Sequence, residues 1–154
     1  MLINDVHILD IMDREELLSV LAPEVRDRID RVEEMYNAPF ARMMGIEPVS
    51  IKKDEVVCTM ELKPEHLNSH GIGHGAAVYA LVDHAFAFAT NIDKDATGVN
   101  CDIRYHRPAK GRLTARTRVV NGSRSLDVIE VNVYSEEGKL VASSTCTSFV
   151  LKRD

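Results

Sequence analysis

The sequence predicts an α+β fold in which one long, apolar helix is wrapped by a curved antiparallel sheet of about five to six strands. The helix is indicated by residues 76–90, where 12 of 15 residues are hydrophobic. The sheet is indicated by the period-two alternation of apolar and polar residues after Gly98. A helix that is apolar on nearly every side must be surrounded, and a second subunit can cover whatever surface the sheet leaves open.

Residues 1–37 are expected to form a helical extension that precedes the main domain at residues 38–154. Asp13 followed by Glu16 fits a capping box at the start of a helix. Pro23 suits the first position of the next helical segment. Beyond this proline, apolar residues recur at helical spacing, at Val25, Ile29, Val32 and Tyr36. These features predict an amphipathic helix that covers the domain.

The main domain is expected to begin with a strand pair or one bent strand over residues 49–62, which Pro64 ends. The apolar helix should then run from near His74 to near Asn91. Tight turns separate the later strands and make them antiparallel neighbours. "NGS" at 121–123 is a hairpin signal, and "EEGK" at 136–139 is another turn. The expected strands cover residues 99–105, 113–119, 129–133 and 140–151.

The bulk composition excludes several classes of protein. A formal net charge of −5 argues against non-specific binding to nucleic acid. The three cysteines include no C-x-x-C pair, which favours reduced thiols in a cytoplasmic protein. The N-terminus lacks the basic segment of a secretory signal, and no apolar run approaches the ~18 residues that would span a membrane. We therefore expect a cytoplasmic protein that binds neither nucleic acid nor membranes.

Two motifs before the helix suggest chemistry that the surrounding sequence does not support. Gly71, Gly73 and Ala76 match a dinucleotide-binding fingerprint, but that motif needs a preceding strand and a parallel βαβ unit. The histidines at 66, 70 and 74 would share one face of a continuous helix and could hold zinc. Pro64 and the glycines at 71 and 73 argue against such a helix, so we expect loop histidines at a pocket rim and no metal site.

A carboxylate within the apolar helix and glycines at its start point to a functional site. Asp83 is flanked by Ala80–Val82 and Ala85–Phe88, and burial there would raise its pKa, while a nearby donor or cation would lower it. Such opposed effects are common at functional sites. Gly71, Gly73 and Gly75 would let a ligand approach the backbone closely. The unpaired amides of a helix N-terminus suit an oxygen that becomes negative during acyl transfer.

The stretch "HLNSHGIGHGAAVYALVDHAFAFATN" resembles the signature of hotdog-fold acyl-CoA thioesterases, especially the phenylacetic-acid-degradation group. The likeness extends through "RYHRPAKGRLTARTRVV" and covers roughly residues 38–152. It implies a hotdog domain that hydrolyses an acyl-CoA thioester to a free acid and coenzyme A, and it implies no metal or prosthetic group. Two residues depart from the family pattern, because Ala76 replaces a glycine and His84 replaces a small hydroxyl residue.

The resemblance also implies roles for individual residues. The backbone N–H of Gly75 would polarise the thioester carbonyl, and Asp83 would act as a nucleophile or as a general base for water. Asn68 would orient water or substrate, and His74 would line the site. Ala76 would lie near the carbonyl and narrow the substrate range.

Spacing alone adds a requirement for self-association. Gly75 and Asp83 are eight residues apart, which places them about 12 Å apart along one helix. Both can act on one thioester only if Gly75 of one subunit meets Asp83 of another. We therefore expect a homodimer, or a dimer of dimers, with two equivalent sites across a two-fold interface.

Substrate contacts are expected from the helix and from a basic segment. The acyl chain would lie against the helix, along Val78, Tyr79, Leu81 and Val82. Basic residues concentrate between residues 104 and 124 of this acidic protein. Among them, those at strand ends are expected to bind the coenzyme A phosphates, namely Arg107, Lys110 and Arg124. Two other functions remain open: an acyl-CoA-binding hotdog module without catalysis, and a hotdog dehydratase, which would need a carboxylate–histidine pair.

Overall fold

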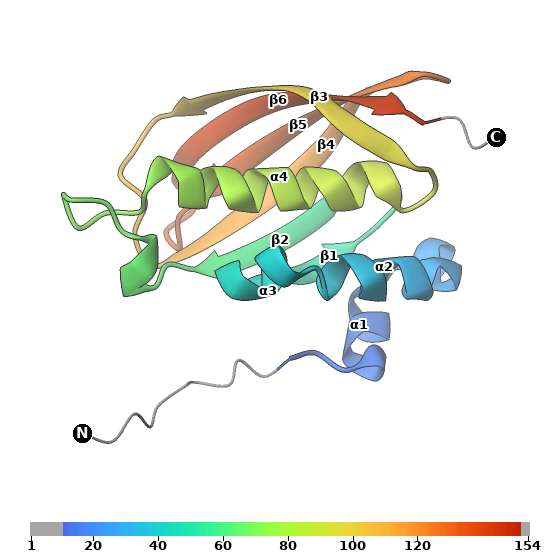
Figure 1. The fold of residues 1–154 in the computed structure, drawn as a ribbon, viewed down its shortest axis with the longest axis horizontal. Coiled ribbons are helices and arrows are strands. Elements are labelled where there is room, and N and C mark those ends of the chain that lie inside the picture. Colours follow the sequence, from blue (N-terminus) through green and yellow to red (C-terminus); the bar gives the residue numbers. More distant parts are fainter. Residues whose placement is uncertain (1–10, 152–154) are drawn as a thin grey trace.

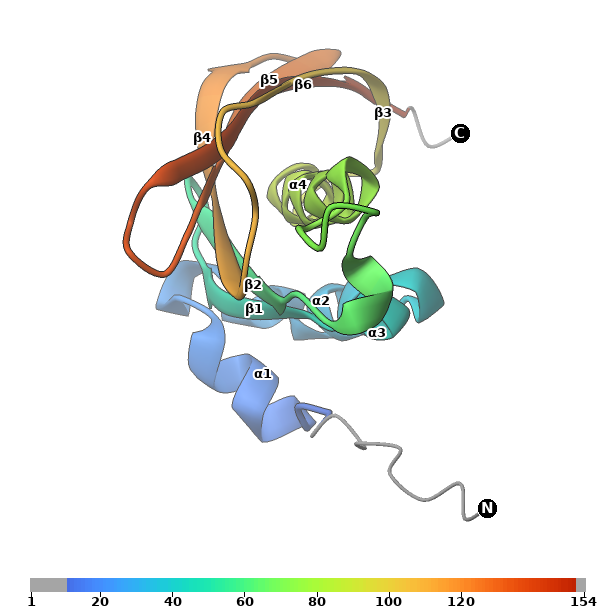
Figure 2. The same cartoon turned by 90° about the vertical axis from the view of Figure 1, so that its left-hand side faces the viewer.

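A computed structural model describes residues 11–151 of the chain. Residues 1–10 of the predicted helical extension and residues 152–154 of the predicted main domain lie outside the described residues. The core of the fold is a six-stranded antiparallel sheet curved around the long helix α4 (Figures 1 and 2). The strand order is β1-β2-β4-β5-β6-β3. The strands are β1 (Ile46–Ile51), β2 (Val56–Glu61), β3 (Ala96–Tyr105), β4 (Arg112–Gly122), β5 (Leu126–Tyr134) and β6 (Leu140–Val150). The predicted wrapped helix is present as α4 (Gly75–Asn91).

The local signals of the sequence correspond closely to these elements, with one shift in a turn. The predicted hairpin joins β4 to β5, but Asn121 and Gly122 belong to β4 and pair with Val128 and Asp127. The turn lies after them, where the Ser123 amide donates to the Leu126 carbonyl at 3.0 Å. An irregularity between Val119 and Asn121 changes the register of the ladder, which carries β4 past the predicted turn.

The N-terminal helices pack on the same core as the sheet. They are α1 (Arg14–Val20), η1 (Pro23–Arg28), α2 (Ile29–Tyr36) and α3 (Pro39–Met44). The predicted capping box is confirmed, since Asp13 accepts from the Glu16 amide and Glu16 accepts from the Asp13 amide. The predicted apolar face is also confirmed, because Val25, Ile29, Val32 and Tyr36 are all buried. Over residues 11–151, no helix combines the length and apolar character needed to cross a membrane.

One side of the molecule leaves apolar surface uncovered. Figure 2 looks along α4 and shows the sheet curving from β1 round to β3, with no strand on the side between β3 and α3. Strand β3 is an edge of the sheet, so one row of its backbone groups has no neighbouring strand. Large apolar side chains are exposed on the elements at this side, namely Phe40 and Met43 of α3, Tyr79 of α4, and Val99 and Tyr105 of β3.

Candidate active site

The loop before α4 holds the start of the helix in a fixed position. The side-chain oxygen of Asn68 accepts hydrogen bonds from the amides of His70 (2.9 Å) and Ile72 (3.4 Å), which closes the loop on itself. Gly73 donates to the Ala109 carbonyl at 2.8 Å. A Cβ at this glycine would lie 2.9 Å from the Ala109 Cβ, which no side-chain rotation can move, so any larger residue would displace the backbone there. These bonds tie the helix start to the segment between β3 and β4.

The first turn of α4 leaves one backbone amide available for a ligand. His74 is the N-cap, and its Nδ1 accepts from the Ala76 amide at 3.0 Å. The amides of Ala77 and Val78 donate to the His74 carbonyl. Within residues 11–151, no partner accepts from the Gly75 amide. The helix therefore presents one free N–H at its positive end, at the residue that the sequence predicts as the oxyanion donor.

Gly75 lines a cavity of about 370 Å³ beside the start of α4. Asn68, Tyr105 and Arg107 also line this cavity, so it brings together residues of the loop, of β3 and of the segment after β3. The Tyr105 hydroxyl donates to the Gly75 carbonyl at 3.0 Å and fixes the helix start from the sheet side. Sequence reasoning missed this contact, although the alternation of β3 placed Tyr105 on the same face as Cys101 and Ile103.

Asp83 lies on the uncovered face of α4, so a single chain does not bury it despite its apolar neighbours in sequence. Its side chain is exposed in the single chain, together with Ala76 and Tyr79. These residues recur at helical spacing on the side that the sheet does not reach, whereas Leu81 and Val82 are fully buried on the inner side. Partial desolvation by neighbouring groups nevertheless raises the pKa of Asp83 above its ordinary value of 3.8.

His84 does not pair with Asp83. Its ring packs edge-on against Phe88 with the centroids 4.9 Å apart, and its Nε2 is buried without a partner among the described residues. Burial, with a smaller effect of the Arg42 charge, lowers the pKa of His84 to about 4, so the ring is neutral at pH 7. The chain thus lacks, at this position, the carboxylate–histidine pair that a dehydratase would need.

The predicted substrate-binding residues lie in different parts of the structure. Ala76 lines a second hollow of about 330 Å³ beside the helix start, with Phe40, Met44 and Leu67. Arg107 lines the Gly75 cavity and donates to the Leu140 carbonyl at 2.8 Å, and Lys110 is exposed in the same segment. Val82 is fully buried in the core and lines neither cavity, because it points toward the sheet.

Arg124 lies apart from the other predicted cations within one chain. Lys110 precedes β4 and Arg124 follows it, and a strand of this length spans about 35 Å. The arginines between them on β4 face carboxylates: Arg112 lies 3.3 Å from Glu61, and Arg116 lies 3.7 Å from Glu55. Arg118 pairs with Glu130. These three form a solvated outer face of the sheet, as expected for any individual arginine there.

The three loop histidines do not share a helix. His66 ends the short 3₁₀ helix η2 (Pro64–His66), and its Nδ1 accepts from the Lys63 amide at 3.2 Å. His70 lies in the loop, and the Nδ1 of His74 caps α4. In the part of the chain that the structure describes, no three His, Cys, Asp or Glu side chains gather closely enough to share a metal ion.

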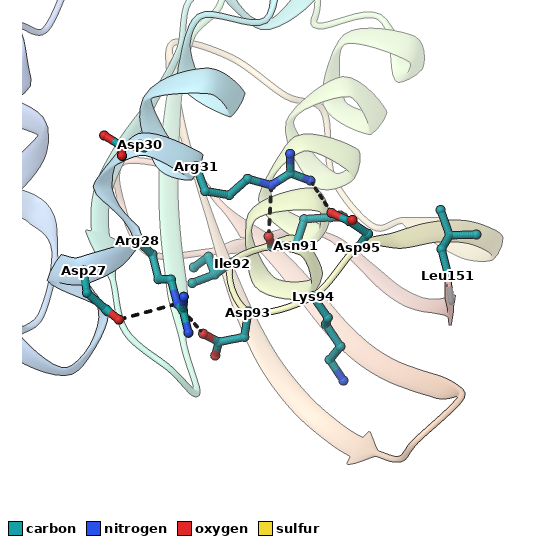
Figure 3. A pocket seen from close by; sticks show the side chains of 10 residues that line it. All are labelled: Asp27, Arg28, Asp30, Arg31, Asn91, Ile92, Asp93, Lys94, Asp95 and Leu151. Atoms are coloured by element: carbon teal, nitrogen blue, oxygen red, sulfur yellow. Dashed lines mark hydrogen bonds and ion pairs between the residues drawn. The ribbon is translucent and has the colours of Figure 1, made fainter. Parts of the chain in front are cut away.

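A third cavity, of about 440 Å³, opens at the other end of α4, and its lining is mainly charged. Figure 3 shows Arg31 of α2 reaching the Asn91 carbonyl (3.3 Å) and Asp95 (3.2 Å). Arg28 bonds Asp93 at 3.1 Å in the same view. These bonds join the N-terminal helices to the segment after α4. We therefore assign this cavity a structural role, remote from Gly75.

Comparisons with known proteins identify relatives of this chain. The model of the Thioesterase superfamily matches residues 70–142. The acyl-coenzyme A thioesterase PaaI of Escherichia coli is 32% identical over 112 residues, which cover 70% of this chain and 80% of that protein. Human acyl-coenzyme A thioesterase 13 is 31% identical over 115 residues, covering 70% of this chain and 82% of its own length.

Solved structures show the same architecture. The Escherichia coli PaaI protein from the phenylacetic acid degradation operon superposes with a TM-score of 0.78 at 26% identity, covering 84% of this chain and 94% of its own. A variant of the phenylacetic acid degradation protein PaaI from Thermus thermophilus gives a TM-score of 0.71 at 40% identity. It covers 74% of this chain and 100% of its own.

Proposed function

Because the chain belongs to the thioesterase superfamily, within its PaaI-like group, and is a thioester hydrolase, we propose that it hydrolyses acyl-coenzyme A thioesters to a free acid and coenzyme A. The predicted hotdog fold, with a long central helix inside a curved antiparallel sheet, is confirmed. The observation that carries the proposal is the free Gly75 amide at the start of α4, which opens onto a cavity beside a cationic segment.

In the proposed reaction, the Gly75 amide donates to the thioester carbonyl oxygen. As the carbonyl carbon becomes tetrahedral, negative charge accumulates on this oxygen, and a donor fixed by the helix N-terminus stabilises it. The Nδ1 of His74 accepts the hydrogen bond from the Ala76 amide, so the Gly75 amide is the free donor of the first turn. His74 and Asn68 act as positioning residues here, because their acceptor atoms are already bonded to backbone amides.

Asp83 supplies the second catalytic group. In one route its carboxylate accepts a proton from an attacking water and the proton passes to the leaving sulfur, so coenzyme A leaves as the thiol. In the other route the carboxylate attacks the carbonyl carbon, coenzyme A leaves as the thiolate, and water then hydrolyses the acyl–aspartyl anhydride to the free acid and regenerates Asp83. Desolvation makes the carboxylate a stronger base than an ordinary aspartate, which suits both roles. The reaction as proposed uses water and groups of the protein, and no step in it requires a metal or prosthetic group.

The two groups meet only between subunits. Gly75 and Asp83 lie on one uninterrupted helix, with about 12 Å of axial rise between them. The uncovered face of α4, the open edge of β3 and the exposed side chains of α3 together supply an apolar surface for a second copy. We propose a homodimer in which the Asp83 of each subunit reaches the Gly75 of the other, with a dimer of dimers as the larger assembly.

The two hollows beside the start of α4 bind different parts of the substrate, one the acyl group and the other the coenzyme A side. Apolar side chains make up most of the lining of the 330 Å³ hollow, which suits the acyl group. The remaining lining residues are Glu65, His66 and His74, and the Glu65 carboxylate disfavours a phosphate there. The Gly75 cavity carries Arg107, with Lys110 nearby, which suits the coenzyme A side. The Ala76 methyl narrows the 330 Å³ hollow and is expected to favour compact acyl groups.

A panel of acyl-CoA esters tests the proposed function. Arylacetyl, aromatic and medium-chain esters are incubated with the protein, and the released thiol is measured with a chromogenic disulfide. Hydrolysis of at least one class is expected, and it should survive exhaustive chelation. Release of thiol from none of these classes would refute the proposed activity, and a chelation loss restored by zinc would refute the metal-free reaction.

A cysteine at position 79 is expected to link two subunits. If residue 75 of one helix lies opposite residue 83 of an antiparallel copy, residue 79 lies on the two-fold axis and faces its own equivalent. Tyr79 is on the exposed face, so its side chain is available for this contact. Tyr79→Cys in a Cys101→Ser background should form a covalent dimer with a short bismaleimide.

The product is read as a doubled mass on a denaturing gel. Glu137→Cys in the β5–β6 turn, in the same background, serves as the control and should remain monomeric under these conditions. Efficient cross-linking of the control alone would contradict the antiparallel arrangement of the two helices.

A further inference from the structure

Two cysteines face each other across neighbouring strands close to Asp83. Cys101 of β3 and Cys146 of β6 are direct partners in the antiparallel ladder, and their Sγ atoms lie 2.8 Å apart. Both thiols are free. Direct antiparallel partners have Cα separations of about 4.5–5.5 Å, which lie within the range of disulfides. The sulfurs would approach by less than about 1 Å to reach a bond length of about 2.05 Å.

The pair lies beneath the uncovered face of α4. Burial is the main cause that raises the pKa of Tyr79 to about 12, with smaller contributions from Cys101 and the Asp83 carboxylate. Burial is also the main cause that raises the pKa of Cys146, with contributions from Cys101 and Asp83. Tyr79, Asp83 and the two cysteines therefore form one cluster, which the proposed reaction uses only at Asp83.

The two thiols differ in exposure, which gives them different chemical roles. Cys101 is half-buried on the edge strand, whereas Cys146 is fully buried and its Sγ lies 3.8 Å from the Ser144 hydroxyl. A small oxidant reaches Cys101 first, since oxidation follows exposure and thiolate character. Cys146 is then held directly opposite as a resolving thiol.

We propose that Cys101 and Cys146 form a redox-sensitive dithiol, which a hydroperoxide converts reversibly into a disulfide beneath Asp83. In the first step the Cys101 sulfur attacks the terminal peroxide oxygen, so Cys101 becomes a sulfenic acid and the peroxide is reduced to an alcohol or to water. In the second step Cys146 attacks the Cys101 sulfur, the S–S bond forms and water leaves. An external dithiol reverses the change by exchange.

The disulfide is expected to lower thioesterase activity, and this consequence rests on the proposed function. The thiols are hydrogen-bond donors beside Tyr79 and Asp83, and a disulfide donates no hydrogen bond. Strand β3 also carries Tyr105, which donates to the Gly75 carbonyl, so a change in β3 also reaches the residue that supplies the oxyanion donor. Loss of such a donor is expected to lower kcat about fivefold.

The site is tested by mass spectrometry, independently of activity. The full chain is treated with hydrogen peroxide at low molar excess, free thiols are alkylated, and peptides are mapped without reduction. A Cys101–Cys146 cross-link is expected, and it should disappear after dithiothreitol. Cys58 of β2 is the matched control, because it is as buried as Cys146 but is separated from β6 by two strands of the sheet. Cys58→Ala should form the same cross-link, whereas Cys101→Ser should form none.

A second variant and an activity assay complete the test. Cys146→Ala should stop the reaction at the Cys101 sulfenic acid, which dimedone traps. Wild-type activity should fall about fivefold on oxidation and return on reduction, whereas Cys101→Ser should not respond. Absence of the cross-link, or a complete cross-link with unchanged activity, would overturn the inference. An inactive reduced enzyme that still forms the cross-link would instead count against the proposed function.

Discussion

Replacing Asp83 with Asn is expected to lower kcat for acyl-CoA hydrolysis by about 10³-fold while leaving the fold intact. Asparagine has nearly the same shape, but it can neither accept the proton from water nor attack the carbonyl as a carboxylate. The folded protein tolerates the change because Asp83 is exposed in each chain and makes no ion pair among the described residues. Its raised pKa also means that the fold disfavours the charged form, so the neutral amide should not destabilise it.

Thiol release, circular dichroism and sedimentation together measure this result. Asp54→Asn in the β1–β2 turn is a matched control and should keep full activity. The wild-type rate should fall as the pH drops through the pKa of Asp83, with a midpoint above 3.8, because only the carboxylate is active. Near-normal turnover by Asp83→Asn would remove Asp83 from the mechanism.

Mixing two inactive variants is expected to restore about a quarter of wild-type activity. Asp83→Ala lacks the carboxylate, and Gly75→Pro lacks the amide hydrogen. Random subunit exchange makes half of the dimers hybrid, and each hybrid has one intact site of two. Proline suits the first helical position, and the preceding His74 already has the extended backbone that a proline requires (φ −61°, ψ 139°).

Two controls separate the lost amide from other effects. A Cβ at position 75 would lie 3.3 Å from the Tyr105 ring, so Gly75→Ala adds this contact while keeping the N–H, and it should retain much of the activity. Asp83→Ala mixed with a Gly75→Pro/Asp83→Ala double variant should stay inactive. If the mixture of Asp83→Ala with Gly75→Pro also stayed inactive despite proven subunit exchange, the proposal of a site shared between subunits would be wrong.

The elements that the sequence predicted well depend on interactions between near neighbours. The Asp13–Glu16 capping box, the helix from His74 to Asn91 and the alternating strands arise from local hydrogen bonds and from the period of apolar residues. The "NGS" turn was displaced because the register of β4 against β5 decides where the hairpin closes. Register is a relation between two strands, and one strand's sequence states it only partly.

The exposure of Asp83 is a second feature that local sequence did not predict. Its apolar neighbours predicted burial, because the sequence shows how apolar the helix is but not which side the sheet covers. The structure covers the side of Leu81 and Val82 and leaves Asp83 on the open side.

The sequence by itself determined the class of fold, the long apolar helix and the eight-residue spacing of Gly75 and Asp83 along it. These follow from periodicity and helical rise, which are properties of consecutive residues. Only the tertiary structure decided that Asp83 lies on the open side of the helix, that Tyr105 holds the helix start, and that Cys101 faces Cys146. Each of these depends on how separate segments pack, because side chains distant in sequence meet only once the sheet has closed around α4.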